Sequence, residues 1–113
     1  MAGTTQSKLL STLGLCARAR GLVVGTPMVC DAMRKKGDVL AVLEASDTSD
    51  NTHRKLESKC AYYGIPHRRL PVTAEELGRG VGKTGAIAAV GITHKGFIQA
   101  LNKHIEPDRP ATK

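Results

Sequence analysis

Residues 39–70, VLAVLEASDTSDNTHRKLESKCAYYGIPHRRL, have the pattern of a strand, a helix and a second strand in succession. The short apolar run 39–45 predicts a buried strand, and the polar turn after it leads into a helix over residues 50–63 that a glycine ends. Residues 65–70 follow as a second strand. Pro66 indicates that this strand starts late or lies near a sheet edge, because proline cannot donate to a strand ladder.

Toward the N-terminus the chain shows the same alternation. Apolar residues at helical spacing predict a helix over residues 7–19, and residues 22–24 predict a short strand. A second helix is then expected to run to about Lys36, with Thr26 as its cap and Pro27 in its first position.

Toward the C-terminus, Thr73 and Glu76 have the spacing of a capping box for a short helix. A glycine-rich loop around Lys83 follows, and the small apolar residues 86–92 predict a central strand. Thr93 is expected to cap a last helix. Helices and strands therefore alternate throughout, which predicts an α/β fold with helices on both faces of the sheet.

Composition narrows the function. The chain has 113 residues, which is the length of one domain, and a net charge of +7 with a pI near 9.7. A basic surface attracts polyanions, and nucleic acid is the leading candidate, although an ordinary solvated surface explains the charge alone equally well. No long apolar run or signal peptide favours a membrane, so we expect a cytoplasmic protein. The three aromatic residues are too few for a base-stacking platform.

The nucleophiles and metal-binding residue types form no catalytic or metal-binding pattern. Cys16, Cys30 and Cys60 include no C-x-x-C pair and are expected to be free thiols in a reducing compartment. The four histidines lack ligand spacing, so we expect no metal and no cofactor. His53 lies one helical turn from Asp50, which favours a capping contact over catalysis. The sequence therefore predicts a protein that is not an enzyme.

Gly82-Lys83-Thr84 is similar to the end of a nucleotide-binding P-loop. That motif needs a glycine at the position of Leu77, a strand before the loop and a helix after it, and the chain meets none of these conditions. No nucleotide cofactor is therefore expected. The loop can still contact phosphate through its N–H groups. The helix start at Thr26 likewise offers free N–H groups to an anion, or is simply a capped helix.

Three stretches carry a family resemblance. They are LLSTLGLCARARGLVVG (9–25), AVLEASDTSDNTHRKLESKCAYYGIP (41–66), and EELGRGVGK with the hydrophobic strand after it (75–92). In order and spacing they resemble the L7Ae/L30e ribosomal-protein family of kink-turn RNA binders, most closely its bacterial YlxQ-type branch. The resemblance covers about residues 8–101, and its most specific element is E-L-G-R-x-x-G.

The resemblance implies a three-layer α/β/α sandwich with a mixed, about four-stranded central sheet. It implies a single RNA-binding domain over residues 1–105 and a flexible C-terminal tail over residues 106–113. It also implies an RNA site built from the start of the second helix, the glycine before it, and the loop before the last strand. In this chain the site residues are Gly25, Thr26, Pro27, Met28, Asp31, Lys83, Thr84, Gly85, Ala86 and Ile87. We add Arg20, Lys35 and Arg79 as candidate phosphate contacts.

We therefore predict a non-enzymatic protein that binds structured, kink-turn-like RNA, is associated with the ribosome, and is a monomer when free. A protein-interaction module on the same fold is the alternative. The family's helix start carries Asn or Lys, then Glu or Gln, and a Lys three residues on. Here those positions hold Pro27, Met28 and Asp31, which supports the alternative.

Overall fold

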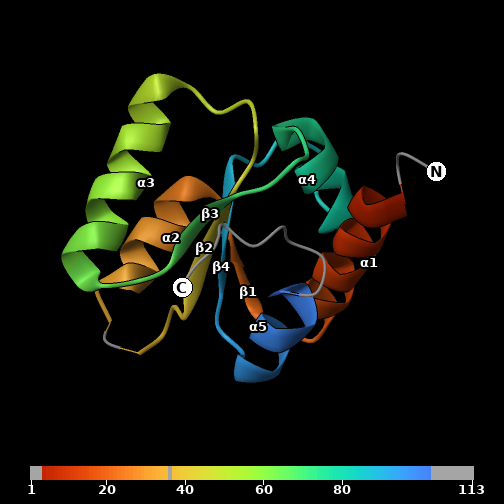
Figure 1. The fold of residues 1–113 in the computed structure, drawn as a ribbon, viewed down its shortest axis with the longest axis horizontal. Helices are drawn as coiled ribbons and strands as arrows, with labels where there is room; N and C mark the ends of the chain where they lie inside the picture. The colour runs from red at the N-terminus through yellow and green to blue at the C-terminus, as the bar shows by residue number, and fades with distance from the viewer. Residues whose placement is uncertain (1–3, 36, 103–113) are drawn as a thin grey trace, which may run out of the picture.

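The computed structural model describes residues 4–35 and 37–102, which fold into three layers (Figure 1). The elements in chain order are α1 (Thr4–Arg18), β1 (Leu22–Val24), α2 (Thr26–Met33), β2 (Ala41–Glu44), α3 (Asp50–Tyr63), β3 (His67–Arg69), α4 (Ala74–Gly80), β4 (Ala89–Ile92) and α5 (Lys95–Asn102). The predicted tail, residues 106–113, lies outside the described residues. Within the described ranges, no helix combines the length and apolarity needed to cross a membrane.

The four strands form one mixed sheet in the order β1-β4-β2-β3. β4 pairs antiparallel with both β1 and β2, whereas β2 and β3 are parallel. This architecture confirms the predicted α/β/α sandwich with a mixed, four-stranded sheet. It also confirms both readings of Pro66, because β3 begins at His67 and lies at the edge of the sheet.

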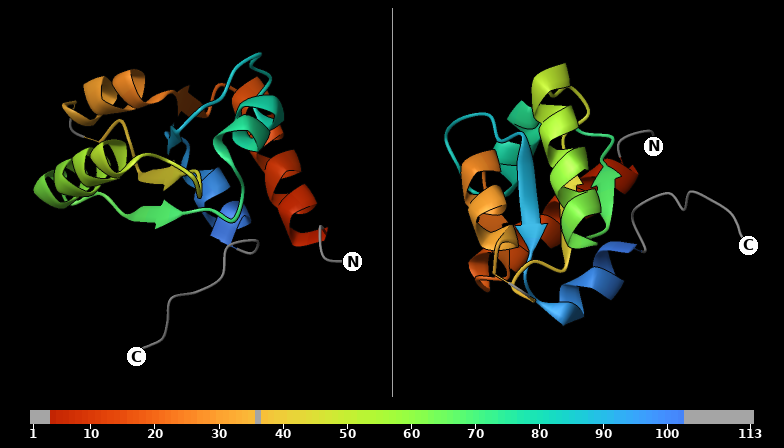
Figure 2. Two further views of the ribbon diagram at one scale, coloured as in Figure 1. Left: turned by 90° about the horizontal axis from the view of Figure 1, so that it is seen from above. Right: turned by 90° about the vertical axis from the view of Figure 1, so that its left-hand side faces the viewer.

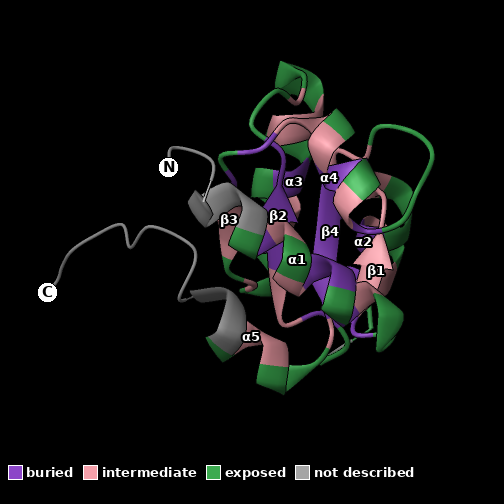
Figure 3. Ribbon diagram, turned by 90° about the vertical axis from the view of Figure 1, so that its right-hand side faces the viewer, coloured by how far each residue is buried: buried purple, intermediate pink, exposed green. Residues whose placement is uncertain are grey.

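Helices cover both faces of the sheet (Figure 2), and a hydrophobic core lies on each face. Successive strand residues point to opposite faces, so Leu43 packs with α1 and α4 while Val42 packs with α2 and α3. The four residues of β4 are all buried, in agreement with its predicted central place (Figure 3). The sheet is therefore covered on both sides, and functional groups must lie at its ends or on the helices.

Local signals set the ends of α3 and α4. The Ser49 hydroxyl accepts a hydrogen bond from the Thr52 N–H, and Gly64 ends α3 with a φ of 70°, so the predicted helix over residues 50–63 is confirmed. The predicted capping box of α4 is also present. The Thr73 hydroxyl accepts from the Glu76 N–H, and the Glu76 carboxylate accepts from the Thr73 N–H.

Two predicted caps are wrong. At α2, Gly25 is the N-cap with a φ of 97°, so Thr26 is already the first helical residue and Pro27 the second. Glycine takes this backbone position because a side chain strains a positive φ. At α5, the cap hydrogen bond is made by His94 rather than Thr93, since His94 Nδ1 accepts from the Gly96 N–H at 3.1 Å.

Several predicted elements are longer than the observed ones. The second helix ends at Met33 instead of Lys36. The strands predicted over residues 39–45 and 86–92 are limited to β2 and β4, because pairing with neighbours covers only four residues of each. Residues 86–88 therefore belong to the loop that precedes β4, here called the α4–β4 loop (residues 81–88).

Candidate nucleic-acid interface

The sheet brings the start of α2 and the α4–β4 loop to the same end of the molecule. β1 and β4 are antiparallel, so Val24 at the end of β1 lies opposite Val90 near the start of β4. The next residue, Gly25, donates its N–H to the Ala89 carbonyl oxygen at 2.9 Å. Because α2 begins after Gly25 and the loop ends just before Ala89, these two parts of the predicted site are neighbours (Figures 1 and 2).

The α4–β4 loop is built onto α4. The Lys83 N–H donates to the Gly78 carbonyl at 2.8 Å, and the Ile87 N–H donates to the Ala74 carbonyl at 2.9 Å. Gly78 also lets the loop approach closely, because a Cβ at that position would lie 1.9 Å from the Gly85 carbonyl oxygen. The glycine of the E-L-G-R element therefore has a packing role, because its missing side chain lets the loop lie directly against α4.

The loop presents positive charge beside an open cavity of about 630 Å³. The cavity is lined by Glu75, Arg79, Lys83, Thr84, Gly85 and Ala86. Arg79 and Lys83 are exposed, so both can contact phosphate. Glu75 was not among the predicted site residues. Its spacing from Arg79, one helical turn, was the available sequence signal that it faces the same surface.

The start of α2 is open to a ligand. A Cβ built on Gly25 meets no described atom within 4 Å, so the space in front of this backbone is free. The first intrahelical hydrogen bond is donated by the Val29 N–H to Gly25 at 2.9 Å, which leaves the N–H groups of Thr26 and Met28 at the helix start. Pro27 has no N–H, and the Met28 side chain is 60% exposed. This end therefore offers two donors and an apolar side chain.

The negative charge of Asp31 is balanced by Arg34, the residue that caps the C-terminal end of α2. Its carboxylate forms a hydrogen-bonded ion pair with Arg34, and both side chains are exposed. The hydrogen bond and the charge of Asp31 raise the pKa of the Arg34 guanidinium. An incoming phosphate would therefore meet a paired carboxylate, whose repulsion is reduced by the neighbouring cation.

Two predicted phosphate contacts lie elsewhere. Lys35 follows the C-terminal end of α2 and lines a separate cavity with Tyr62 and Tyr63, so it is at the opposite end of the helix from Thr26. Arg20 precedes β1 and lies at the strand end away from Gly25. Both residues are near the site in sequence but not in space, because α2 separates Lys35 from Thr26 and β1 separates Arg20 from Gly25.

The predicted contact of His53 with Asp50 is also wrong. His53 contacts the buried carboxylate of Glu44, with Nδ1 at 2.9 Å from Oε1, instead of capping through Asp50. Glu44 precedes His53 by nine residues and lies on another element, so helical spacing could not reveal this contact. The glycine–lysine–threonine loop, in contrast, follows α4 and precedes β4, which is the reverse of the order in a P-loop.

Comparison with known proteins agrees with this arrangement. The model of the ribosomal protein L7Ae/L30e/S12e/Gadd45 family matches residues 7–102. The chain is 37% identical to the RNA-binding protein YlxQ of Bacillus subtilis (strain 168) over 89 residues, which are 79% of this chain and 86% of that protein. It is 29% identical to the RNA-binding protein YlxQ of Enterococcus faecium over 102 residues, covering 89% of this chain and 94% of that protein.

Solved structures show the same fold. A protein with unknown function from Bacillus halodurans C superposes with a TM-score of 0.77 and 37% identity, covering 86% of this chain and 95% of that chain. The 15.5kD RNA binding protein of Giardia lamblia superposes with a TM-score of 0.69 at 17% identity, covering 88% and 83%, which is a likeness of fold. The resemblance seen in the sequence is therefore confirmed, and the chain belongs to the ribosomal protein L7Ae/L30e/S12e/Gadd45 family.

Proposed function

We propose that this protein binds structured RNA of the kink-turn kind through one end of its sheet. The observation that carries the proposal is the Gly25–Ala89 hydrogen bond, which makes the start of α2 and the α4–β4 loop into one surface. Two bacterial relatives are named RNA-binding proteins, which supports the same ligand class. The net charge of +7 suits a polyanion.

The surface suits a bent RNA backbone more than a regular duplex. Lys83, Arg79 and the loop N–H groups contact phosphates on one side, while the open backbone at Gly25 admits a close approach on the other. Met28 packs on a base or a ribose, because its exposed thioether side chain is apolar and adaptable. Recognition by shape with few base contacts is the usual mode for structured RNA.

We further propose that the protein is a binding protein without catalytic activity. It acts in the cytoplasm as a free monomer and associates with ribosomal RNA or another structured noncoding RNA. The names of the family and of the two relatives support a binding role.

Fluorescence anisotropy with a labelled kink-turn RNA and an unbent duplex of equal length tests the proposal. We expect tighter binding of the kink-turn RNA. Lys83→Glu should weaken it by about tenfold or more, because it loses a phosphate contact and adds repulsion. Lys95→Glu is the matched control, since Lys95 opens α5 at the opposite end of β4. Equal losses in the two variants, or equal affinity for both RNAs, would refute this surface as the site.

A protein-interaction module is the second candidate, and the exposed Pro27 and Met28 favour it. These side chains offer an apolar patch without base-specific donors. An absence of RNA binding at low salt, where electrostatic binding is strongest, would favour this candidate. Loss of a protein partner in a Met28→Lys variant, with its folding unchanged, would then locate the patch.

A further inference from the structure

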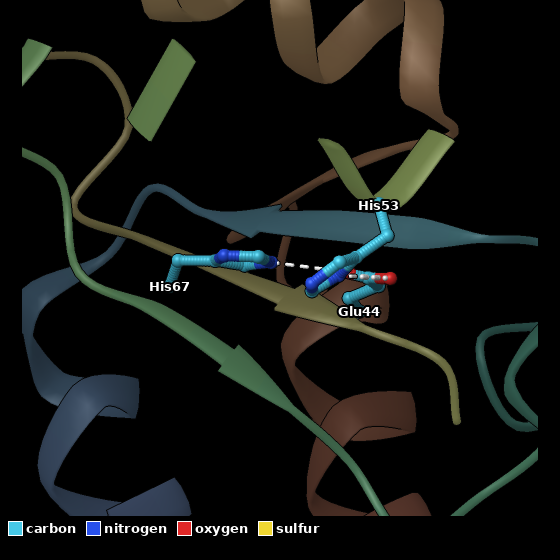
Figure 4. A group of neighbouring side chains, drawn as sticks. All are labelled: Glu44, His53 and His67. Atoms are coloured by element: carbon cyan, nitrogen blue, oxygen red, sulfur yellow. Dashed lines mark hydrogen bonds and ion pairs between the residues drawn. The ribbon is translucent and has the colours of Figure 1, made fainter. Parts of the chain in front are cut away.

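A carboxylate and two imidazoles meet at the end of the sheet, under the first turn of α3. Glu44 ends β2 and its side chain is 0% exposed. His53 lies in α3 and His67 is the first residue of β3. Figure 4 shows the three side chains pointing toward one another from these three elements. The cluster takes no part in the proposed RNA surface.

The sheet register explains how the residues converge. β2 and β3 are parallel, with Val42 opposite His67 and Glu44 opposite Arg69. Residues two apart on a strand face the same side, so all four lie on the side of the sheet that α2 and α3 cover, where Val42 enters the core. The chain turns into α3 after residue 49 and returns His53 over the same place. The donor atoms are therefore positioned by the fold itself.

Both imidazoles contact the same carboxylate oxygen atom. His67 Nε2 lies 2.7 Å and His53 Nδ1 lies 2.9 Å from Oε1 of Glu44. One ligand atom from each of the three residues lies within 4.8 Å of the others. Two imidazole nitrogens and a carboxylate oxygen form a three-ligand set typical of zinc sites that keep one position for water.

His53 Nδ1 also lies 3.0 Å from the other carboxylate oxygen, Oε2, which has further partners. The Thr48 hydroxyl donates to it, and Arg69 Nη2 lies 3.7 Å away. Burial raises the pKa of Glu44, but the hydrogen bonds from Thr48, His53 and His67 outweigh it and lower the pKa. The Thr48 hydroxyl thus holds the carboxylate in orientation at Oε2, as outer contacts hold ligands in metal sites, whereas Arg69 acts only through its charge.

We propose that Glu44, His53 and His67 bind a zinc ion, with water as the fourth ligand. Tetrahedral zinc with bonds of about 2.0–2.1 Å holds its ligand atoms roughly 3.3 Å apart. The contacts at 2.7 and 2.9 Å must therefore lengthen by about half an ångström, which small side-chain rotations supply. The side chains of His53 and His67 are 29% and 14% exposed, so an ion can enter from solvent past the imidazoles.

Without an ion, the same atoms form a hydrogen-bonded network. Each imidazole must then carry its proton on the nitrogen that faces Glu44. The ion displaces those protons to solvent, and the other nitrogen of each ring takes up a proton, so the imidazoles stay neutral. Arg69, whose side chain is 46% exposed, can turn away to solvent. A metal site and a purely structural hydrogen-bonded cluster are distinguished by one measurement, because only a metal site has an affinity for zinc that depends on both histidines.

Calorimetric titration of the metal-stripped full-length protein with zinc tests the site. We expect one ion per chain, a higher unfolding temperature with zinc, and visible absorption of a low-symmetry site with cobalt. His53→Gln and His67→Gln should each weaken binding at least tenfold, since even outer contacts of metal sites contribute ten- to a hundredfold. His94→Gln is the matched control, because His94 lies between β4 and α5, at the end of β4 away from Glu44, and it should bind zinc as the parent does.

Two further variants make the result decisive. Cys30→Ser should bind zinc normally, and a thiolate charge-transfer band with cobalt would place the ion on cysteine and overturn the proposal. Arg69→Gln keeps all three ligands but removes a positive charge near Oε2, so we expect severalfold tighter binding even if a histidine variant fails to fold. No zinc binding by the folded parent, or unchanged affinity in both histidine variants, would also overturn it.

Discussion

Gly78 shows how one missing side chain shapes a surface. An alanine Cβ at this position would lie 1.9 Å from the Gly85 carbonyl oxygen, so the α4–β4 loop would have to move away from α4. We expect Gly78→Ala to destabilise the protein by about 1–3 kcal/mol, the usual cost of overpacking, as measured by urea unfolding. Because the loop carries Lys83, RNA binding should weaken in the same variant.

Gly85→Ala is the control for this prediction. A Cβ at Gly85 meets no described atom within 4 Å, although the residue lies in the same loop. Its unfolding midpoint should therefore match that of the parent. Similar midpoints for the two alanine variants would mean that the loop rests on α4 less closely than the hydrogen bonds of Lys83 and Ile87 indicate.

The cysteines provide a chemical test of burial. Burial raises the pKa of the Cys16 and Cys60 thiols to about 11, and for Cys60 the nearby negative charges of Cys30 and Glu44 act in the same direction. The thiolate is the reactive form, so at pH 8 only about one of these thiols in a thousand can attack iodoacetamide. We expect Cys30, which is partly exposed, to be alkylated first, with the other two reacting faster as pH rises toward 11.

Peptide mass spectrometry after timed alkylation measures the three rates. Unfolding in urea should make them equal, which is the internal control. Equal rates in the folded protein would show that Cys16 and Cys60 are not held in the core.

Single-residue predictions succeeded where residue type alone decides the outcome and failed where backbone geometry decides it. Thr73 was correctly predicted as a cap. Thr26 has the same side chain but was wrongly predicted, because Gly25 can take a φ of 97° and the helix starts one residue earlier than expected. His94 was missed as a cap since imidazole is an uncommon capping group.

The start of α2 can be tested by exchanging its three unusual residues together. Pro27→Asn adds a backbone N–H, Met28→Glu adds a carboxylate that can accept hydrogen bonds from a base edge, and Asp31→Lys adds a positive charge. All three positions are exposed. One good base contact contributes about 1–3 kcal/mol, so we expect roughly tenfold or greater gain in kink-turn affinity. Anisotropy titrations of the triple variant and the parent measure it.

An unbent duplex is the control in the same titrations. The triple variant carries a net gain of positive charge, so a small, salt-sensitive rise for the duplex is expected. A gain for the kink-turn RNA that does not exceed this rise would mean that the helix start does not touch bases, and the interaction-module candidate would then be favoured.

Helix ends that carry a local capping signal were predicted more accurately than the ends of β2 and β4, for a physical reason. The end of α3 is encoded by Gly64 and the start of α4 by Thr73 and Glu76, all within one turn of the helix they limit. Strand ends depend on how far the neighbouring strand continues. β4 stops pairing with β2 at Ala89, so the apolar residues before it were wrongly included in the strand.

Placement in three dimensions was the least predictable property. The resemblance correctly implied the fold, and the α4–β4 loop and the start of α2 do meet. Yet Lys35 lies beyond the C-terminal end of α2, Arg20 lies before β1, and Glu44 contacts His67 across 23 residues of sequence. No local pattern encodes such contacts, because they arise only when parallel strands and their connecting helix assemble.

The two basic residues Arg79 and Lys35 therefore allow a test of how the RNA lies on the molecule. Arg79 borders the loop cavity, whereas Lys35 lies beyond the far end of α2. Each phosphate contact releases counterions, so removing one should make the salt dependence of log affinity shallower by about one unit. We expect this for Arg79→Gln and a parent-like slope for Lys35→Gln, measured at four or more salt concentrations. If Lys35→Gln gave the shallower slope and Arg79→Gln did not, the RNA would follow α2 toward Tyr62 and Tyr63, and the loop would not be its contact.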